Sequence, residues 1–224
     1  MNVLRILFLG LFICFLCELS AQFFHNDFTR HDTLRGSLGE FRSNYDVLSY
    51  ELDLKVIIDR KEIKGSNKIG FKCTKDLDTL QLDLFSNMYV DSIVFLNENI
   101  SFRRDSNVIF VHFPWRLMKE NTHFIHVYYH GIPVIAKNAP WNGGFVWEKD
   151  KNGADWVGVA CEGVGASLWW PNKDHLSDEP DNMKIHLTVP SELIAVSNGQ
   201  LFRTKKLRNG YTRYSWKVSY PINN

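Results

Sequence analysis

The stretch Tyr50-Glu-Leu-Asp-Leu-Lys-Val56 alternates strictly between apolar and polar side chains. Leu52, Leu54 and Val56 face one way, whereas the charged residues between them face the other way. A period of two residues is typical of a β-strand with one buried face, because successive side chains of an extended chain point to opposite sides. This stretch therefore predicts a half-buried strand.

The same alternation continues along the chain, and Asp59-Arg-Lys-Glu62 is typical of the turn that would start the returning strand. The further segments that we predict as strands are 63–73, 79–84, 90–96, 100–102, 108–113, 123–130, 183–189 and 213–218. No segment after Gln22 has a sustained helical stripe with caps. Short strands joined by polar turns indicate an all-β fold, either a saddle-like curved sheet or a β-sandwich of antiparallel strands.

Composition excludes several classes of protein. The 224 residues include 26 Lys and Arg against 25 Asp and Glu, so no excess of positive charge favours nucleic-acid binding. Hydrophobic residues make up 45% of the chain and aromatic residues 14%, which suffices for a packed core and excludes a disordered chain. A long apolar run occurs only at the N-terminus, which argues against a polytopic membrane protein.

The N-terminal segment 1–21 is typical of a signal peptide. Arg5 supplies positive charge, residues 6–17 are apolar apart from one glycine, and Ser20-Ala21-Gln22 offers small residues for cleavage. Glu18 ends the apolar run short of the roughly 20 residues that a spanning helix needs. We therefore expect export to the periplasm or the extracellular space, with no stable membrane span after cleavage. The alternative is an uncleaved anchor.

Cysteine and histidine residues indicate no metal site. Cys73 and Cys161 remain after cleavage, and two separate buried thiols are favoured over a disulfide between them. His126 and His130 share one face of a predicted strand but lie roughly 13 Å apart along it. One zinc cannot bridge that distance, because its ligand bonds are about 2 Å long. We therefore expect no metal ligands in this chain.

Residues 136–180 interrupt the alternation and predict a long Trp/Gly-rich loop. Five tryptophans lie in this segment: Trp141, Trp147, Trp156, Trp169 and Trp170. Long loops on β scaffolds often carry function, and glycine lets a backbone approach a ligand closely. Its tryptophans either pack singly into the core or form an aromatic platform. The acidic run Asp174, Asp178, Glu179 and Asp181 is interpreted as a solvated loop, because the glycine-containing spacing of a calcium loop is missing.

Several short motifs follow one another in a characteristic order. They are Tyr45-Asp-Val47, Tyr50-Glu-Leu-Asp-Leu54, Ile63-Lys-Gly65, Leu82-Asp-Leu84, Tyr128-Tyr-His-Gly131, Ala160-Cys-Glu-Gly-Val-Gly-Ala-Ser-Leu-Trp-Trp-Pro-Asn-Lys-Asp174, Asp178-Glu-Pro180, Leu187-Thr-Val-Pro190 and Ala195-Val-Ser-Asn-Gly199. This set resembles the N-terminal domain of the zinc aminopeptidases related to aminopeptidase N and leukotriene hydrolase. The resemblance implies an N-terminal β-domain at 45–224, which leaves residues 22–44 as an N-terminal extension after the predicted signal peptide at 1–21. The family's Arg-rich approach to a Pro-Cys-x-Asp-x-Pro segment is replaced here by Leu168-Trp-Trp-Pro-Asn-Lys-Asp174.

The resemblance also implies a substrate site. In the family, a Gln or Glu of this domain lines the active-site cleft and holds the free α-amino group of the peptide, and Glu162 is the matching position. Gly163 and Gly165 would let the substrate pass close to the backbone. Zinc is expected in the full-length enzyme, bound by a His-Glu-x-x-His helix of the catalytic domain, and that motif is missing from these 224 residues.

Two functions follow from these observations. The first is the substrate-recognition domain of an exported zinc aminopeptidase, truncated before its catalytic domain and inactive alone. Its partners would be a peptide with a free N-terminus and the catalytic domain in cis, and nucleic acid is excluded. The second is a stand-alone secreted module in which Trp141, Trp147, Trp156 and Trp169 bind a peptide or glycan.

Overall fold

The structure is a computed structural model that describes residues 28–139 and 141–222. The expected signal peptide lies outside the described residues. The chain divides into two compact units, residues 1–30 and 31–224, and the β-fold belongs to the second. Within the described ranges, no helix has both the length and the hydropathy that are needed to cross a bilayer.

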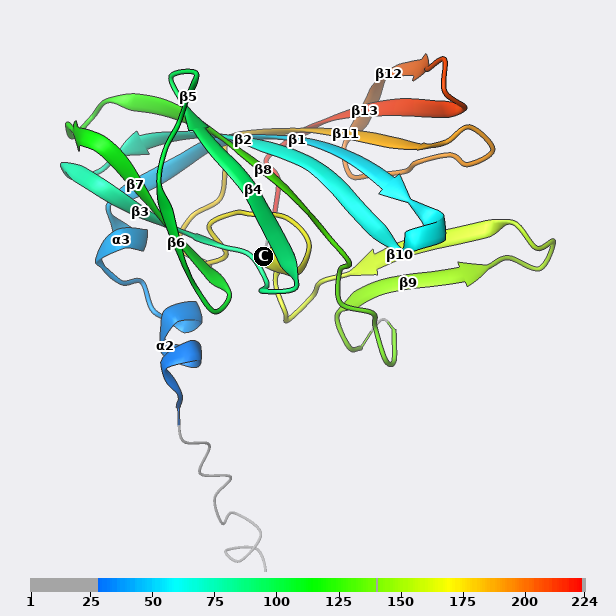
Figure 1. Cartoon of the computed structure of the whole chain (residues 1–224), viewed down its shortest axis with the longest axis horizontal. Coiled ribbons are helices and arrows are strands. Elements are labelled where there is room, and N and C mark those ends of the chain that lie inside the picture. Colours follow the sequence, from blue (N-terminus) through cyan, green and yellow to red (C-terminus); the bar gives the residue numbers. More distant parts are fainter. Residues whose placement is uncertain (1–27, 140, 223–224) are drawn as a thin grey trace, which may run out of the picture. The chain divides into compact units, whose positions relative to one another are not determined.

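The largest element is a sheet of eight strands in the order β12-β13-β11-β1-β2-β8-β4-β5 (Figure 1). Its strands are β1 (Tyr45–Ile57), β2 (Glu62–Cys73), β4 (Met88–Phe95), β5 (Glu98–Asn99), β8 (Thr122–Gly131), β11 (Asn182–Pro190), β12 (Gln200–Lys206) and β13 (Tyr211–Ser219). The pairs are antiparallel as predicted, except that β1 and β11 run parallel. A parallel pair needs a long crossover, and the chain between the end of β1 and the start of β11 provides it.

Two smaller sheets complete the all-β fold. The first contains β3 (Leu77–Asp83), β7 (Val108–Leu117) and β6 (Phe102–Asp105), in that order. The second is the hairpin of β9 (Gly144–Lys149) and β10 (Asp155–Ala160), which extends away from the other sheets in Figure 1. This hairpin lies inside the predicted Trp/Gly-rich loop, so part of that segment is regular structure.

The hydrophobic core lies between the large sheet and the three-stranded sheet. Leu52 and Leu54 of β1 are buried, as their alternation predicts, and they belong to one cluster with apolar residues of β3 and β7. Aromatic rings join the two layers: the ring of Phe71 on β2 lies 5.9 Å from the ring of Phe113 on β7. Burial of these inward faces is the main driving force for the fold.

In the described residues before the sheet lie two short helices, where the sequence pattern predicted none. They are α2 (Arg30–Gly36) and α3 (Glu40–Ser43). No residue of α2 is buried, and the buried residue of α3 is Arg42. A helix without an apolar face leaves no hydrophobic period in the sequence, and that is why the pattern missed both.

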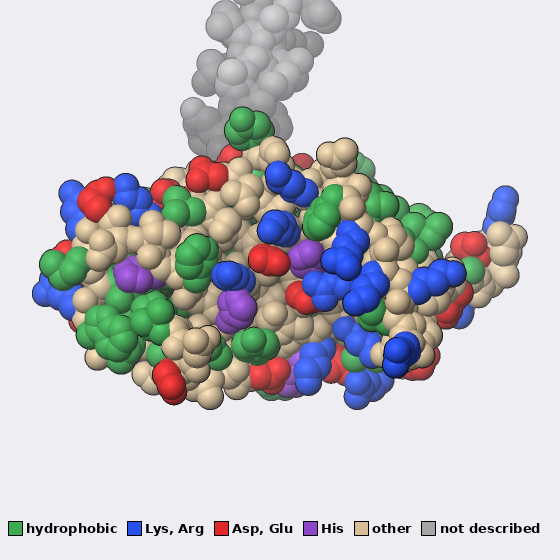
Figure 2. Space-filling model, turned by 90° about the horizontal axis from the view of Figure 1, so that it is seen from above, with side chains coloured by type: hydrophobic (Ala, Val, Ile, Leu, Met, Phe, Trp, Pro, Cys, Tyr) green, Lys and Arg blue, Asp and Glu red, His purple; other side chains and the backbone are tan. Residues whose placement is uncertain are grey.

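The outer face of the large sheet carries many charged side chains. Figure 2 views this face and shows Lys and Arg side chains gathered over β11, β12 and β13. Lys184, Lys217 and Lys205 are exposed in these strands, whereas Arg213 forms an ion pair of 2.8 Å with Asp53 on β1. Positive side chains are therefore unevenly distributed over the surface, although the net charge of the chain is close to zero.

Candidate functional site

The 161–165 turn follows strand β10 and carries Glu162. The amides of Val164 and Gly165 both donate to the carbonyl oxygen of Cys161, at 3.2 and 2.8 Å. Glu162 is exposed, and its carboxylate makes no hydrogen bond or ion pair with any residue that the structure describes. A free carboxylate on a hydrogen-bonded turn is available to a cationic group from outside.

The two glycines of this turn have different surroundings. Gly163 has a φ of +76° and Gly165 a φ of +81°, and glycine adopts this left-handed region without steric penalty. A Cβ atom on Gly163 would meet nothing within 4 Å, so the space beside Glu162 is open. A Cβ atom on Gly165 would lie 2.0 Å from the Asp174 carboxylate. Gly165 therefore lets the turn pack directly against Asp174.

Residues 166–180, which we call the 166–180 strap, continue from the turn and are anchored by buried polar contacts. Oδ2 of Asp174 accepts hydrogen bonds from the amide and the hydroxyl of Ser167, at 3.1 and 2.5 Å. The amide of Asp174 donates to Oδ2 of Asp83 on β3, at 3.0 Å. Backbone hydrogen bonds of 2.7 and 3.1 Å join Asp83 to Asn172. The strap is thereby fixed to the edge of the three-stranded sheet.

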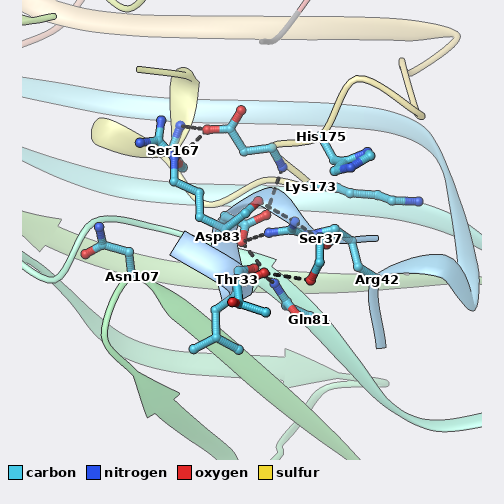
Figure 3. A network of polar contacts seen from close by, with 12 residues as sticks. Thr33, Ser37, Arg42, Gln81, Asp83, Asn107, Ser167, Lys173 and His175 are labelled. Carbon is cyan, nitrogen blue, oxygen red and sulfur yellow. Dashed lines mark hydrogen bonds and ion pairs between the residues drawn. The ribbon is translucent and has the colours of Figure 1, made fainter. Parts of the chain in front are cut away.

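Asp83 lies at the centre of this network (Figure 3). Its Oδ1 accepts a hydrogen bond from the fully buried guanidinium of Arg42 and another of 3.2 Å from Gln81. Burial raises the pKa of Asp83 to about 6, and the charge of Arg42 opposes this rise. A buried carboxylate is costly unless a cation and hydrogen-bond donors surround it, and this one has both.

A second buried ion pair shows that the interpretation of the acidic run as a solvated loop was wrong for Asp178. The Lys173 ammonium lies 2.6 Å from Oδ2 of Asp178 and also donates to the carbonyl of Tyr45, at 2.7 Å. The amide of Val47 donates to the same carboxylate oxygen, at 3.0 Å. Asp178 is therefore an internal link between the strap and β1. Glu179 and Asp181 are exposed, as expected for a solvated loop.

The tryptophans do not gather into the aromatic platform that the second hypothesis needs. Trp147 and Trp169 pack against the buried ring of Phe145, with centroids 5.5 and 5.8 Å from it. Trp141 and Trp156 are 82% and 62% exposed, and neither contacts another ring among the described residues. Trp147 and Trp169 are instead partly buried against the hydrophobic core.

The described cysteines and histidines have separate partners. Cys73 and Cys161 are free thiols, buried and half-buried, and burial raises the pKa of each. His130 contacts Asp91 at 2.7 Å, and His126 lies 3.5 Å from the hydroxyl of Tyr128. Across residues 28–139 and 141–222, no group of three metal-ligating side chains comes together.

We predict that the purified chain binds no stoichiometric zinc. No histidine of the sequence is followed by Glu, and His126 and His130 have different neighbours. Metal analysis after dialysis measures this directly, with a His126→Ala variant as the control for adventitious binding. One tightly held zinc per chain would contradict the prediction, and its loss in the variant would locate the ligand.

Comparisons with known proteins agree with this architecture. The family model described as the Peptidase M1 N-terminal domain matches residues 46–223. No curated protein matches the chain. The M1 zinc metallopeptidase of Deinococcus radiodurans has a TM-score of 0.65 and 21% identity over 78% of this chain and 39% of its own. A mutant of this metallopeptidase, solved with a Tyr-Ser-Ala substrate, gives a TM-score of 0.64 at 20% identity, again over 78% and 39%.

Native leukotriene A4 hydrolase of Saccharomyces cerevisiae has a TM-score of 0.61 and 18% identity, over 80% of this chain and 28% of the hydrolase. Identities this low establish a shared fold alone. The chain spans less than half the length of each of these structures.

Proposed function

Because this chain belongs to the peptidase M1 N-terminal domain family, we propose that it recognises substrates for an exported zinc aminopeptidase whose catalytic domain lies in the same polypeptide. The domain would bind the free N-terminus of a peptide and would have no hydrolytic activity alone. The Deinococcus relative, a zinc metallopeptidase solved with a Tyr-Ser-Ala substrate, supports a peptide as the ligand.

One observation carries this proposal: the carboxylate of Glu162 on the 161–165 turn has no partner among residues 28–139 and 141–222. A peptide N-terminus is an ammonium group, and it forms short charge-assisted hydrogen bonds with a carboxylate. An internal peptide bond or a blocked N-terminus offers no such charge. Glu162 would thus distinguish free N-termini from all other parts of a peptide.

The neighbourhood of Glu162 suits this role in two ways. The turn is closed by its own hydrogen bonds and fixed by the packing of Gly165 on Asp174, so the backbone that carries Glu162 is held in place before the ligand arrives. Such preorganisation limits the entropy that is lost on binding. The open space at Gly163 leaves room for the first residue of the peptide beside the carboxylate.

Zinc does not fit the residues of this chain. The names of the relatives imply the metal, but no histidine here precedes a glutamate, and the described residues contain no three-ligand cluster. The metal would be held by the catalytic domain. The contribution of this domain would be to bind the peptide and hold its N-terminus.

The decisive test compares peptides with free and acetylated N-termini before and after removal of the Glu162 carboxylate. The enzyme for this test is the chain joined to its catalytic domain, which can be sought in the reading frame beyond the codon for Asn224. A preference for free N-termini that survives the loss of the carboxylate would refute the proposed role.

We predict export with cleavage after Ala21. The charge of Arg5, the short apolar run and the small residues before Gln22 support this. N-terminal sequencing of the secreted protein should begin at Gln22, and replacing Ala21 by Trp should block cleavage at that bond. A product that begins at Met1 and stays in the membrane would show an uncleaved anchor instead.

A further inference from the structure

The end of helix α2 is held by side chains of α3 and β3. Helix ends leave backbone carbonyls without intrahelical partners. Here Gln81 donates to the carbonyl of Leu34 at 3.0 Å, and Arg42 donates to those of Arg35 and Ser37 at 2.6 and 2.8 Å. Since α2 buries no residue, these polar contacts fix its position on the fold.

This anchored backbone directs the side chain of Arg35 to the 161–165 turn. Its guanidinium donates to the carbonyl oxygen of Val164 and lies 5.5 Å from the ring centre of Phe85. Among the described residues, no other group donates to that carbonyl. Phe85 belongs to the same assembly, because its amide donates to the carbonyl of Ser167 at 2.8 Å. Arg35 is therefore a direct link between the N-terminal helices and the turn that carries Glu162.

A second route connects the same two regions. Arg42 pairs with Asp83, and Asp83 accepts the hydrogen bond of the Asp174 amide. The carboxylate of Asp174 holds Ser167 and packs against Gly165. Arg35 thus holds the turn at Val164. The contacts that run from Arg42 through Asp83 to Asp174 hold the chain at Gly165 and Ser167.

We infer that residues 31–44 are part of the substrate site and that Arg35 is a positioning residue for the 161–165 turn. This segment precedes residues 46–223, which the family model matches. Its relevance to substrate rests on the proposed function of Glu162. The restraint of the turn by Arg35 follows from the contact of its guanidinium with Val164 and does not depend on substrate.

Amide hydrogen exchange on the 224-residue chain tests the restraint. Replacing Arg35 by alanine removes a charged donor, and hydrogen bonds to charged groups are the stronger kind. We expect the amides of Val164 and Gly165 to exchange about 10-fold faster, since local opening sets exchange rates in such turns. Amides of β2 and β8 should keep their rates. Arg35→Lys should restore part of the protection, because an ammonium can still donate to the carbonyl.

Arg60→Ala is the matched control, because Arg60 is an exposed arginine in a surface ion pair with Glu62. It should leave the exchange of the turn unchanged. Wild-type exchange at Val164 and Gly165 in Arg35→Ala would overturn the inference. A uniform acceleration that includes β2 and β8 would also overturn it, because it would mean that Arg35 stabilises the whole fold. If Arg35→Ala does not fold, Arg35→Gln decides between the same outcomes.

Kinetics of the complete enzyme separate this inference from the proposed function. With the catalytic domain attached, Arg35→Ala should raise KM about 5- to 10-fold while kcat changes less than about 2-fold, because a displaced Glu162 weakens the binding of the N-terminus. One outcome would be faster hydrogen exchange of the turn amides in Arg35→Ala, together with normal kinetics of both Arg35→Ala and Glu162→Ala. That outcome would refute the proposed function, but it would leave the restraint of the turn by Arg35 intact. A loss of kcat alone, with an unaltered turn, would refute the positioning role.

Discussion

Replacing Glu162 by alanine, in the chain joined to its catalytic domain, is expected to lower kcat/KM for an aminoacyl substrate roughly 10- to 150-fold. The reason is the loss of the proposed hydrogen bond between the carboxylate and the ammonium group of the peptide, because hydrogen bonds to charged groups are worth about 1.5–3 kcal/mol. Folding should be unaffected, since the side chain of Glu162 is exposed and makes no contact with a described polar group. The measurements are steady-state kinetics and a melting curve.

Glu179→Ala provides the matched control, because Glu179 is an exposed acidic residue of the adjoining 166–180 strap. It removes the same charge from the chain and should leave kcat/KM unchanged. Equal losses in both variants would point to a long-range effect of charge. A large fall in the melting temperature of Glu162→Ala would show that its role is structural.

The largest effect on stability is expected from Arg42→Ala. This change leaves the buried carboxylate of Asp83 without its cation, and breaking a buried ion pair from one side costs about 3–5 kcal/mol. Urea denaturation of the two proteins measures the difference. Arg116→Ala is the control: Arg116 is exposed and lies 3.8 Å from Asp76, so its loss should change stability by about 0–1 kcal/mol. If Arg42→Ala lowered the free energy of unfolding by only about 0–1 kcal/mol, Arg42 would not stabilise the buried carboxylate of Asp83 as we describe.

The same pair predicts how this loss depends on pH. Burial raises the pKa of Asp83 from 3.8 to about 6, so the folded protein holds this proton more tightly than the unfolded chain does. The contribution of Asp83 to stability therefore falls as the pH rises from about 4 to about 6. Without Arg42 the folded-state pKa rises further, so the fall continues to higher pH. The difference between wild type and Arg42→Ala should be smaller at about pH 4.5 than at about pH 8; a constant difference would exclude Asp83 as its cause.

Much of the fold could be predicted from the sequence, because a β-strand with one buried face has alternating apolar and polar residues. The alternation of Leu52 and Leu54 identified β1, and similar patterns identified most strands of the two larger sheets. Strand β12 was missed because it is exposed on both faces, so it has no apolar period. The parallel pairing of β1 and β11 was missed, because the direction of pairing depends on the path of the chain between the two strands. The alternation of side chains within a strand carries no information about that path.

The candidate site was predictable only in part. Family resemblance, rather than periodicity, singled out Glu162, and the structure adds that its carboxylate is unpaired among the described residues. Arg42 and Asp83 gave no signal, because a buried ion pair between residues 41 positions apart has no local pattern. Asp178 was misjudged for a related reason: acidic residues usually face solvent, and its burial depends on Lys173 and on backbone donors from β1.

The parallel pair of β1 and β11 also governs the order in which this domain can assemble during synthesis. The register joins Tyr50 to Met183 and Leu54 to Leu187, so the pairing has to wait until the ribosome has released residues of β11. Until then β1 can pair with β2 alone, and its other edge presents unsatisfied backbone groups to any passing strand. Closing so long a loop is slow, because its entropy is lost before the contacts form. While that edge stays open, it is a site at which the nascent domain can pair with another chain.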